Sequence, residues 1–168
     1  FMNKYNRIRV EAISGAIGAD IFNVDISQSL DSIVFEELRC AFLEYLVICI
    51  RDQQLEPKTQ LNFAKLFGEP MIYPFVKGLG QYPQVTPVIK EKTDLINFGG
   101  LWHSDTSYEA TPPLGTMLYA RELPPFGGDT EFANMYLAYE TLSSGLKKIL
   151  ENLVAVNISG KGRVQNTR

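Results

Sequence analysis

The chain has 168 residues with 45% hydrophobic and 21% charged side chains, which is typical of a globular domain rather than a disordered segment. A formal net charge of −3 gives no reason to expect a nucleic-acid partner, and we expect no membrane span or signal peptide because no apolar run is long enough. Cys40 and Cys49 lie in apolar segments, so we expect buried, reduced thiols in a cytoplasmic protein with a single domain over residues 1–168.

The first third of the chain predicts strands around one helix. Residues 7–13 alternate apolar and polar side chains, which is typical of a strand with one buried face, and residues 19–24 favour a second short strand. Apolar residues recur at three- and four-residue spacing over 32–45, which predicts an amphipathic helix. The β-branched run at 46–50 predicts a strand buried on both faces.

The later elements are shorter and separated by turns. Pro57 begins a predicted helix that stops at Gly68, and an irregular but ordered loop is expected over 69–83. Pro87 interrupts a further apolar run, which places that run at a sheet edge. The remaining pattern predicts strands at 85–89, 116–121, 129–133 and 154–158, and helices at 136–142 and 145–153.

The segment Trp102-His103-Ser104-Asp105 contains the only histidine of the chain. On a strand, the side chains of His103 and Asp105 would lie on one face, because side-chain direction alternates along a strand. An imidazole and a carboxylate side by side are two of the three ligands in the facial triad of non-haem Fe(II) oxygenases. The third ligand is a second histidine, which this sequence lacks. Taken alone, such a pair more often marks a strand histidine with satisfied hydrogen bonds than a metal site.

Several short motifs give this pair a context, because they occur in the order seen in one enzyme family. With them the chain resembles the taurine dioxygenase family of Fe(II)/2-oxoglutarate oxygenases, the group that includes the 2,4-dichlorophenoxyacetate dioxygenases. The motifs are Ile17-Gly18-Ala19-Asp20-Ile21, Ile50-Arg51-Asp52-Gln53, Leu66-Phe67-Gly68-Glu69, Leu101-Trp102-His103-Ser104-Asp105, Pro112-Pro113, and Leu123-Pro124 leading to Gly127-Gly128-Asp129-Thr130.

The resemblance implies an α+β fold, a double-stranded β-helix (jelly roll) with flanking helices. It also implies hydroxylation of a small organic acid of sulfonate or carboxylate type, with Fe(II) as cofactor, 2-oxoglutarate and O₂ as co-substrates, and succinate and CO₂ as co-products. His103 and Asp105 match the first two iron ligands. Thr130 matches the threonine that hydrogen-bonds the distal carboxylate of 2-oxoglutarate, although a strand threonine after a Gly-Gly turn is also common.

The substrate positions differ from those of the taurine enzymes. Tyr73 stands where those enzymes have a histidine that helps bind the sulfonate, and Gly99 stands where they have an asparagine. Both differences argue against taurine as the substrate. Tyr73, Asn97, Phe98 and Tyr108 are candidates for the lining of an altered pocket, and ordinary packing of a loop around the core explains them equally well.

The resemblance further implies that the chain is truncated before the C-terminal strands, with the second histidine and the 2-oxoglutarate-binding arginine in the missing part. Residues 159–168 are then expected to form a mobile loop or tail. Uncovered sheet edges favour a homo-oligomer or another covering partner. An alternative function stays open at this point: a catalytically incomplete fragment of the family that acts as a binding or interaction module.

Overall fold

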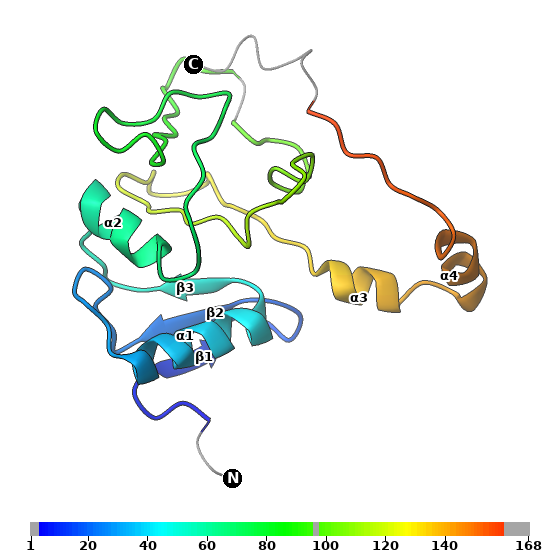
Figure 1. The fold of residues 1–168 in the computed structure, drawn as a ribbon, viewed down its shortest axis with the longest axis horizontal. Helices are drawn as coiled ribbons and strands as arrows, with labels where there is room; N and C mark the ends of the chain where they lie inside the picture. Colours follow the sequence, from blue (N-terminus) through cyan, green and yellow to red (C-terminus); the bar gives the residue numbers. More distant parts are fainter. Residues whose placement is uncertain (1–3, 96–97, 160–168) are drawn as a thin grey trace. The chain divides into compact units, whose positions relative to one another are not determined.

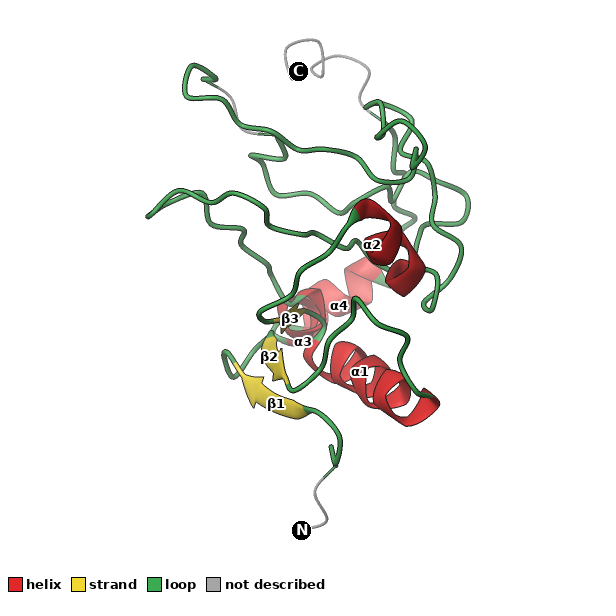
Figure 2. Cartoon of the chain, turned by 90° about the vertical axis from the view of Figure 1, so that its left-hand side faces the viewer, coloured by secondary structure: helices red, strands yellow, loops and turns green. Residues whose placement is uncertain are grey.

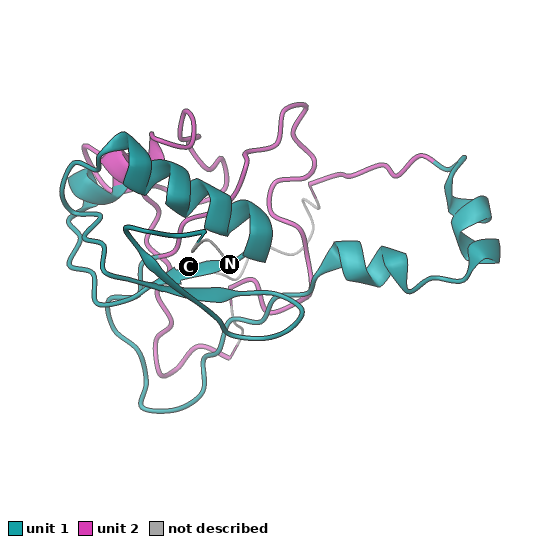
Figure 3. Cartoon of the chain, turned by 90° about the horizontal axis from the view of Figure 1, so that it is seen from below, with its two compact units in different colours: residues 1–60, 119–153 teal, residues 61–118, 154–168 magenta. Residues whose placement is uncertain are grey.

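The computed structural model describes residues 4–95 and 98–159. The chain divides into two compact units, coloured separately in Figure 3. Unit 1 consists of Phe1–Gln60 and Tyr119–Leu153, and unit 2 of Leu61–Leu118 and Val154–Arg168. The single domain over 1–168 stays a prediction, because a compact unit is not in itself an independently folding domain. Of the predicted tail at 159–168, all but residue 159 lies outside the described residues.

A three-stranded sheet is the centre of unit 1 (Figure 1). Strand β1 (Arg9–Ala12) pairs antiparallel with β2 (Ala19–Phe22), and β2 pairs in parallel with β3 (Ile48–Ile50). In this register Val10 lies opposite Ile21. Ala19 and Ile21 are fully buried on β2, which the other two strands flank. The central strand therefore supplies buried core residues. The strands predicted at 7–13 and 19–24 are both confirmed, with shorter bounds.

Helix α1 (Ser32–Tyr45) lies against this sheet (Figure 2). It begins where the Asp31 side chain accepts a hydrogen bond from the Val34 N–H, and it ends at Leu46, which takes a left-handed conformation with φ of 66°. Leu38 and Ala41 are fully buried on its inner face. The predicted amphipathic helix over 32–45 is thus confirmed, because the apolar spacing and an N-terminal cap both favour the same residues.

Three shorter helices follow, near the positions that the sequence predicts. They are α2 (Pro57–Ala64), α3 (Met135–Glu140) and α4 (Ser144–Leu150). Phe63 of α2 is buried and packs edge-to-face on Phe67, whereas α3 and α4 bury none of their residues. Asn134 caps α3 and also donates a side-chain hydrogen bond to the Ala16 carbonyl oxygen in the same unit. None of the helices in 4–95 and 98–159 is long and apolar enough to cross a membrane.

Several predicted strands are not strands in the structure. Residues 85–89, 116–121, 129–133 and 154–158 form no strand within the described chain. A strand needs a neighbour that exchanges a series of backbone hydrogen bonds with it. The described residues give these segments no such neighbour, and Val85 makes only two isolated backbone hydrogen bonds, with Leu79 and Tyr82. The α+β class is confirmed by the sheet and helices of unit 1. The jelly roll stays a prediction.

Two predictions about burial are wrong. The residues of β3 are half-buried rather than buried on both faces, because its outer edge has no strand beside it in the described chain. Cys40 is exposed on α1 and Cys49 is half-buried on β3, and both are free thiols. The apolar neighbours of Cys40 in the sequence misled the prediction, because they lie on the other face of the helix.

Candidate metal centre

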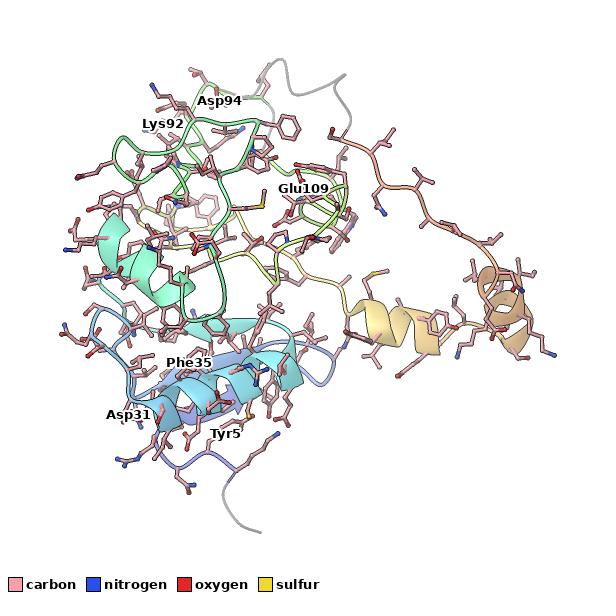
Figure 4. All side chains as sticks on the ribbon, in the orientation of Figure 1. Tyr5, Asp31, Phe35, Lys92, Asp94 and Glu109 are labelled. Atoms are coloured by element: carbon pink, nitrogen blue, oxygen red, sulfur yellow. The ribbon has the colours of Figure 1, made fainter. Side chains whose placement is uncertain are left out.

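The His-x-Asp pair lies in unit 2 on irregular backbone, not on the strand that the sequence suggested. Residues 102–104 have no regular structure, and residues 105–108 form a turn. The turn is closed by the Glu109 N–H, which donates to the Thr106 carbonyl oxygen at 3.0 Å (Figure 4 labels Glu109). The two side chains nevertheless meet, with His103 Nε2 3.0 Å from Asp105 Oδ1. The two side chains therefore meet without the strand that was expected to align them.

A backbone carbonyl sets the orientation of the imidazole. His103 Nδ1 lies 2.6 Å from the Leu101 carbonyl oxygen. A carbonyl oxygen only accepts, so Nδ1 carries the hydrogen and donates it. In the neutral ring the lone pair is then on Nε2, the atom that faces Asp105. Metal-binding histidines commonly have this arrangement, with the non-ligating nitrogen held by a carbonyl or carboxylate oxygen.

A threonine hydroxyl holds the outer oxygen of the carboxylate. Thr116 Oγ1 donates to Asp105 Oδ2 at 2.7 Å, and Oδ1 is the oxygen near Nε2. The side chains of His103 and Asp105 are each about half exposed, at 52% and 50%. Each ligand-type side chain is thus fixed at its outer polar atom and presents its inner atom to the other residue and to solvent.

The distance between the two inner atoms fits a divalent metal ion. Bonds of about 2.1 Å to nitrogen and oxygen, at the right angle of neighbouring octahedral positions, place the two donor atoms about 3.0 Å apart. The observed separation is 3.0 Å. Without an ion, the same distance suits a hydrogen bond from a doubly protonated imidazole to Oδ1. Within the described parts of the chain, these two residues have no further histidine, cysteine, aspartate or glutamate beside them that would complete a group of three ligands.

Two neighbouring residues adopt left-handed backbone conformations at this pair. Gly99 has φ of 68°, and a Cβ atom there would lie 3.3 Å from His103 Cε1, so the imidazole packs where a side chain would otherwise be. Thr106, which follows Asp105, is buried with φ of 47°, and its hydroxyl has no hydrogen-bond partner among the described residues. A β-branched residue in this region is strained, and such strain concentrates at functional sites.

The predicted substrate residues Tyr73 and Tyr108 are joined by an aromatic row in unit 2. The Phe75 ring packs edge-to-face on both, with ring centroids 5.6 Å from Tyr73 and 5.9 Å from Tyr108. The Tyr108 hydroxyl is buried and has no hydrogen-bond partner in the described chain. Burial, and after it the charges of Tyr73, Glu109 and Asp105, raises the pKa of the Tyr108 hydroxyl. Tyr108 is therefore a neutral hydroxyl group near the carboxylate of Asp105.

The other predicted site residues have different placements. Thr130 belongs to unit 1, is exposed, and follows Gly127 and Gly128, both of which have φ of 75°. The positive φ of both glycines supports the predicted Gly-Gly turn, because only glycine adopts this conformation without strain. Asn97 lies outside the described residues. The role of Thr130 stays a prediction.

The sequence reasoning missed Thr116 and Thr106. Thr116 is the first residue of a predicted strand, and nothing in its spacing relative to Asp105 predicts a contact between them. Thr106 is visible in the sequence only as the residue after the motif. Both emerge only from the three-dimensional structure, through a hydrogen bond in one case and a backbone angle in the other.

Comparison with known proteins places the chain among dioxygenases. The family model for "Taurine catabolism dioxygenase TauD, TfdA family" matches residues 9–168. An alkylsulfatase of Acinetobacter baylyi is 33% identical over 156 residues, covering 92% of this chain and 48% of that protein. An alpha-ketoglutarate-dependent sulfate ester dioxygenase of Pseudomonas putida is 32% identical over 156 residues, covering 88% of this chain and 48% of that protein.

Two further relatives extend the range of substrates and add a solved structure. An alpha-ketoglutarate-dependent 2,4-dichlorophenoxyacetate dioxygenase of Cupriavidus pinatubonensis is 31% identical over 154 residues, covering 82% of this chain and 53% of that protein. The crystal structure of a taurine dioxygenase from Burkholderia xenovorans superposes with a TM-score of 0.76 at 31% identity, covering 88% of this chain and 52% of that one. The chain thus spans about half the length of the relatives it matches.

Proposed function

Because this chain belongs to the taurine catabolism dioxygenase TauD, TfdA family, we propose that it is the N-terminal part of an Fe(II)- and 2-oxoglutarate-dependent dioxygenase. The reaction is hydroxylation of a small organic acid, with succinate and CO₂ as co-products. The complete protein has the jelly roll that the resemblance implies, and its later strands pair with the extended segments that lack neighbours here.

One observation carries this proposal: two unlike donor atoms, His103 Nε2 and Asp105 Oδ1, lie 3.0 Å apart, each with its outer atom already hydrogen-bonded. These residues would hold the Fe(II). When bound, the ion supplies the redox chemistry that couples oxidation of 2-oxoglutarate by O₂ to hydroxylation of the substrate. The Leu101 carbonyl keeps the Nε2 lone pair free for the ion, and the ionised Asp105 offsets part of its positive charge.

The remaining ligands are proposed by resemblance. The Thr130 hydroxyl donates to the distal carboxylate of 2-oxoglutarate. A second histidine and an arginine beyond the present sequence complete the metal and co-substrate sites. The observation that favours completion in a longer protein is the half exposure of His103 and Asp105, which leaves the ion accessible to further ligands.

We propose that the substrate lies beside Tyr73, Gly99 and Tyr108, and that Asn97, which lies outside the described residues, also contributes to its binding. The edge-to-face row through Phe75 would give the bound substrate an aromatic neighbour, and the Tyr108 hydroxyl is a neutral donor without a partner in the described chain. A hydroxyl donor beside an aromatic wall suits an acidic oxygen attached to an apolar group. Sulfate esters, sulfonates and aryloxyacetates share this chemistry.

A second candidate function, an incomplete binding module, is favoured by one observation. Among the described residues, no third histidine, cysteine, aspartate or glutamate side chain joins His103 and Asp105. Such a module would bind a small acid or a partner without redox chemistry.

Succinate formation by the full-length protein distinguishes the two functions. The protein is incubated with Fe(II), 2-oxoglutarate, O₂ and a panel of alkyl sulfates, sulfonates and aryloxyacetates, and succinate is quantified. We expect succinate formation that depends on a member of the panel and is abolished by Asp105→Ala. Undiminished succinate formation by Asp105→Ala would refute the assignment of the metal site. A folded wild-type protein with no succinate above background would favour the binding module.

A further inference from the structure

We propose that Thr116 is a positioning residue for the metal ligand Asp105: its hydroxyl holds Oδ2 and leaves Oδ1 as the one oxygen that binds the ion. This inference rests on the proposed metal site and adds a residue to it. Thr116 is not a ligand itself, because the atom it would offer is engaged with Asp105.

The geometry of the carboxylate supports this role. A carboxylate binds a metal through one oxygen or through both, and its terminal torsion is soft, so its two oxygens exchange easily when nothing holds them. The Thr116 hydroxyl lies 2.7 Å from Oδ2, a short and charge-assisted hydrogen bond. The other oxygen, Oδ1, is the atom 3.0 Å from His103 Nε2. The hydrogen bond therefore selects which oxygen faces the imidazole.

The side chain of Thr116 is suited to hold a fixed direction. Threonine is β-branched and has restricted rotation at χ1, so its hydroxyl direction follows from the backbone. Thr116 and Asp105 both belong to unit 2, so their contact lies within one compact body. Within the described chain, the only other polar contact of the Asp105 carboxylate is the one with His103. No second donor from these residues is in place to hold Oδ2 if Thr116 is lost.

The two outer contacts of the site differ in origin. His103 is oriented by a backbone carbonyl, which no substitution of Leu101 removes. Asp105 is oriented by a side chain, so its orientation depends on the identity of residue 116. Loss of an outer hydrogen bond of this kind typically weakens metal binding by about 10- to 100-fold.

The test is metal affinity in the full-length apoprotein, measured with Mn²⁺ and Co²⁺ in the absence of 2-oxoglutarate. Thr116→Val keeps the shape and removes the hydroxyl, and Thr116→Ser restores it. We expect Thr116→Val to raise the dissociation constant by about 10- to 100-fold, and Thr116→Ser to recover most of the wild-type affinity. The visible spectrum of bound Co²⁺ reports coordination, and we expect it to change in Thr116→Val and to return in Thr116→Ser. Thr93→Val, at an exposed threonine of the same unit, is the control that leaves affinity unchanged.

The outcomes separate this inference from the proposed function. Wild-type affinity and spectrum in Thr116→Val, together with loss of binding in Asp105→Ala, would overturn the role of Thr116 and leave the metal site intact. A wild-type protein that binds no more tightly than Asp105→Ala would overturn both. Failure of Thr116→Ser to restore affinity would assign the effect to packing and overturn the positioning role. If Thr116→Val does not fold, Thr116→Ala is measured with the same expectation.

Discussion

His103 Nε2 lies 3.0 Å from Asp105 Oδ1, although neither residue is on a strand. Each side chain makes a second hydrogen bond through its outer atom: His103 Nδ1 with the Leu101 carbonyl oxygen, and Asp105 Oδ2 with the Thr116 hydroxyl. We infer that these two hydrogen bonds help to hold the two atoms close together. We therefore expect metal affinity at the proposed site to depend on residues that do not contact the ion.

Gly99 provides the first test of this dependence. Its missing side chain makes room for the imidazole, because a Cβ atom would lie 3.3 Å from His103 Cε1 on a backbone with φ of 68°. We expect Gly99→Ala to push the ring away from Asp105 and to weaken Mn²⁺ binding by about 10-fold or more, as measured by titration of the full-length apoprotein.

The control for Gly99→Ala is Gly127→Ala. Gly127 has a similar φ of 75°, and a Cβ atom there would meet nothing within 4 Å, so the substitution reproduces the backbone strain without the contact. Both variants should lose stability, and only Gly99→Ala should lose metal affinity. Equal metal affinities in the two variants would contradict the packing argument.

Glu37 makes the N-terminal segment sensitive to acid. Its carboxylate accepts hydrogen bonds from the N–H groups of Asn6, Arg7 and Ile8. Burial acts to raise the pKa of Glu37, but these backbone donors outweigh it and hold that pKa below its ordinary value. The stabilisation is therefore fully present above the ordinary pKa of a glutamate and is lost as the pH falls through the lowered value.

We expect Glu37→Gln to flatten this acid dependence, because an amide does not titrate. The free energy of unfolding is measured in urea between about pH 6 and about pH 3. The matched control is Glu36→Gln, at an exposed residue of α1 whose Oε2 lies 3.6 Å from Arg39 Nη1. This variant should keep the wild-type dependence of the unfolding free energy on pH. A Glu37→Gln profile parallel to the wild type would show that this carboxylate does not carry the acid dependence.

Asp31 is expected to stabilise α1 as its N-terminal cap. Its carboxylate accepts from the Val34 N–H at 2.9 Å. Asp31→Ala removes this acceptor and should lower the free energy of unfolding by about 1 kcal/mol, whereas Asp31→Asn should retain most of it. Urea unfolding followed by circular dichroism measures both, and an Asp31→Ala variant as stable as Asp31→Asn would rule out the capping role.

Tyr108 and Tyr119 allow the effect on stability of a tyrosine hydroxyl without a hydrogen-bond partner to be compared with that of a hydrogen-bonded one. Tyr108 has no hydroxyl partner in the described chain, whereas the Tyr119 hydroxyl accepts from the Leu55 N–H and donates to the Gln53 carbonyl oxygen. We expect Tyr108→Phe to leave stability unchanged or to raise it by about 1 kcal/mol, and Tyr119→Phe to lower it by about 1 kcal/mol. Thermal unfolding measures the two shifts, and destabilisation by Tyr108→Phe would mean that its hydroxyl is already satisfied without substrate.

Local signals predicted the positions of the elements in residues 4–60 well. The helix over 32–45 has the same bounds in the structure, because apolar spacing, a capping aspartate and the following β-branched run all favour them. The strands at 85–89, 116–121, 129–133 and 154–158 were wrong for the described chain, although their residues have strand propensity. Strand formation depends on a partner elsewhere, and propensity within a segment does not report whether the partner is present.

The site was predicted in part. The residue types of His103 and Asp105, and the motifs around them, were sufficient to predict that the two side chains meet and to predict the family. The metal centre stays a prediction. The outer contacts were not predictable, because Thr116 lies in another segment and the Leu101 interaction uses a backbone atom that every residue has. The turn at 105–108 was also missed, because His103 and Asp105 were interpreted as residues of a strand.

The most direct test of the metal site is an anaerobic titration of the full-length protein with Fe(II) and 2-oxoglutarate, monitored by visible absorption. We predict a saturable charge-transfer band in the wild-type protein that is absent in His103→Ala. A folded wild-type protein without such a band, or a His103→Ala variant with an undiminished one, would contradict the assignment of His103 and Asp105 as iron ligands.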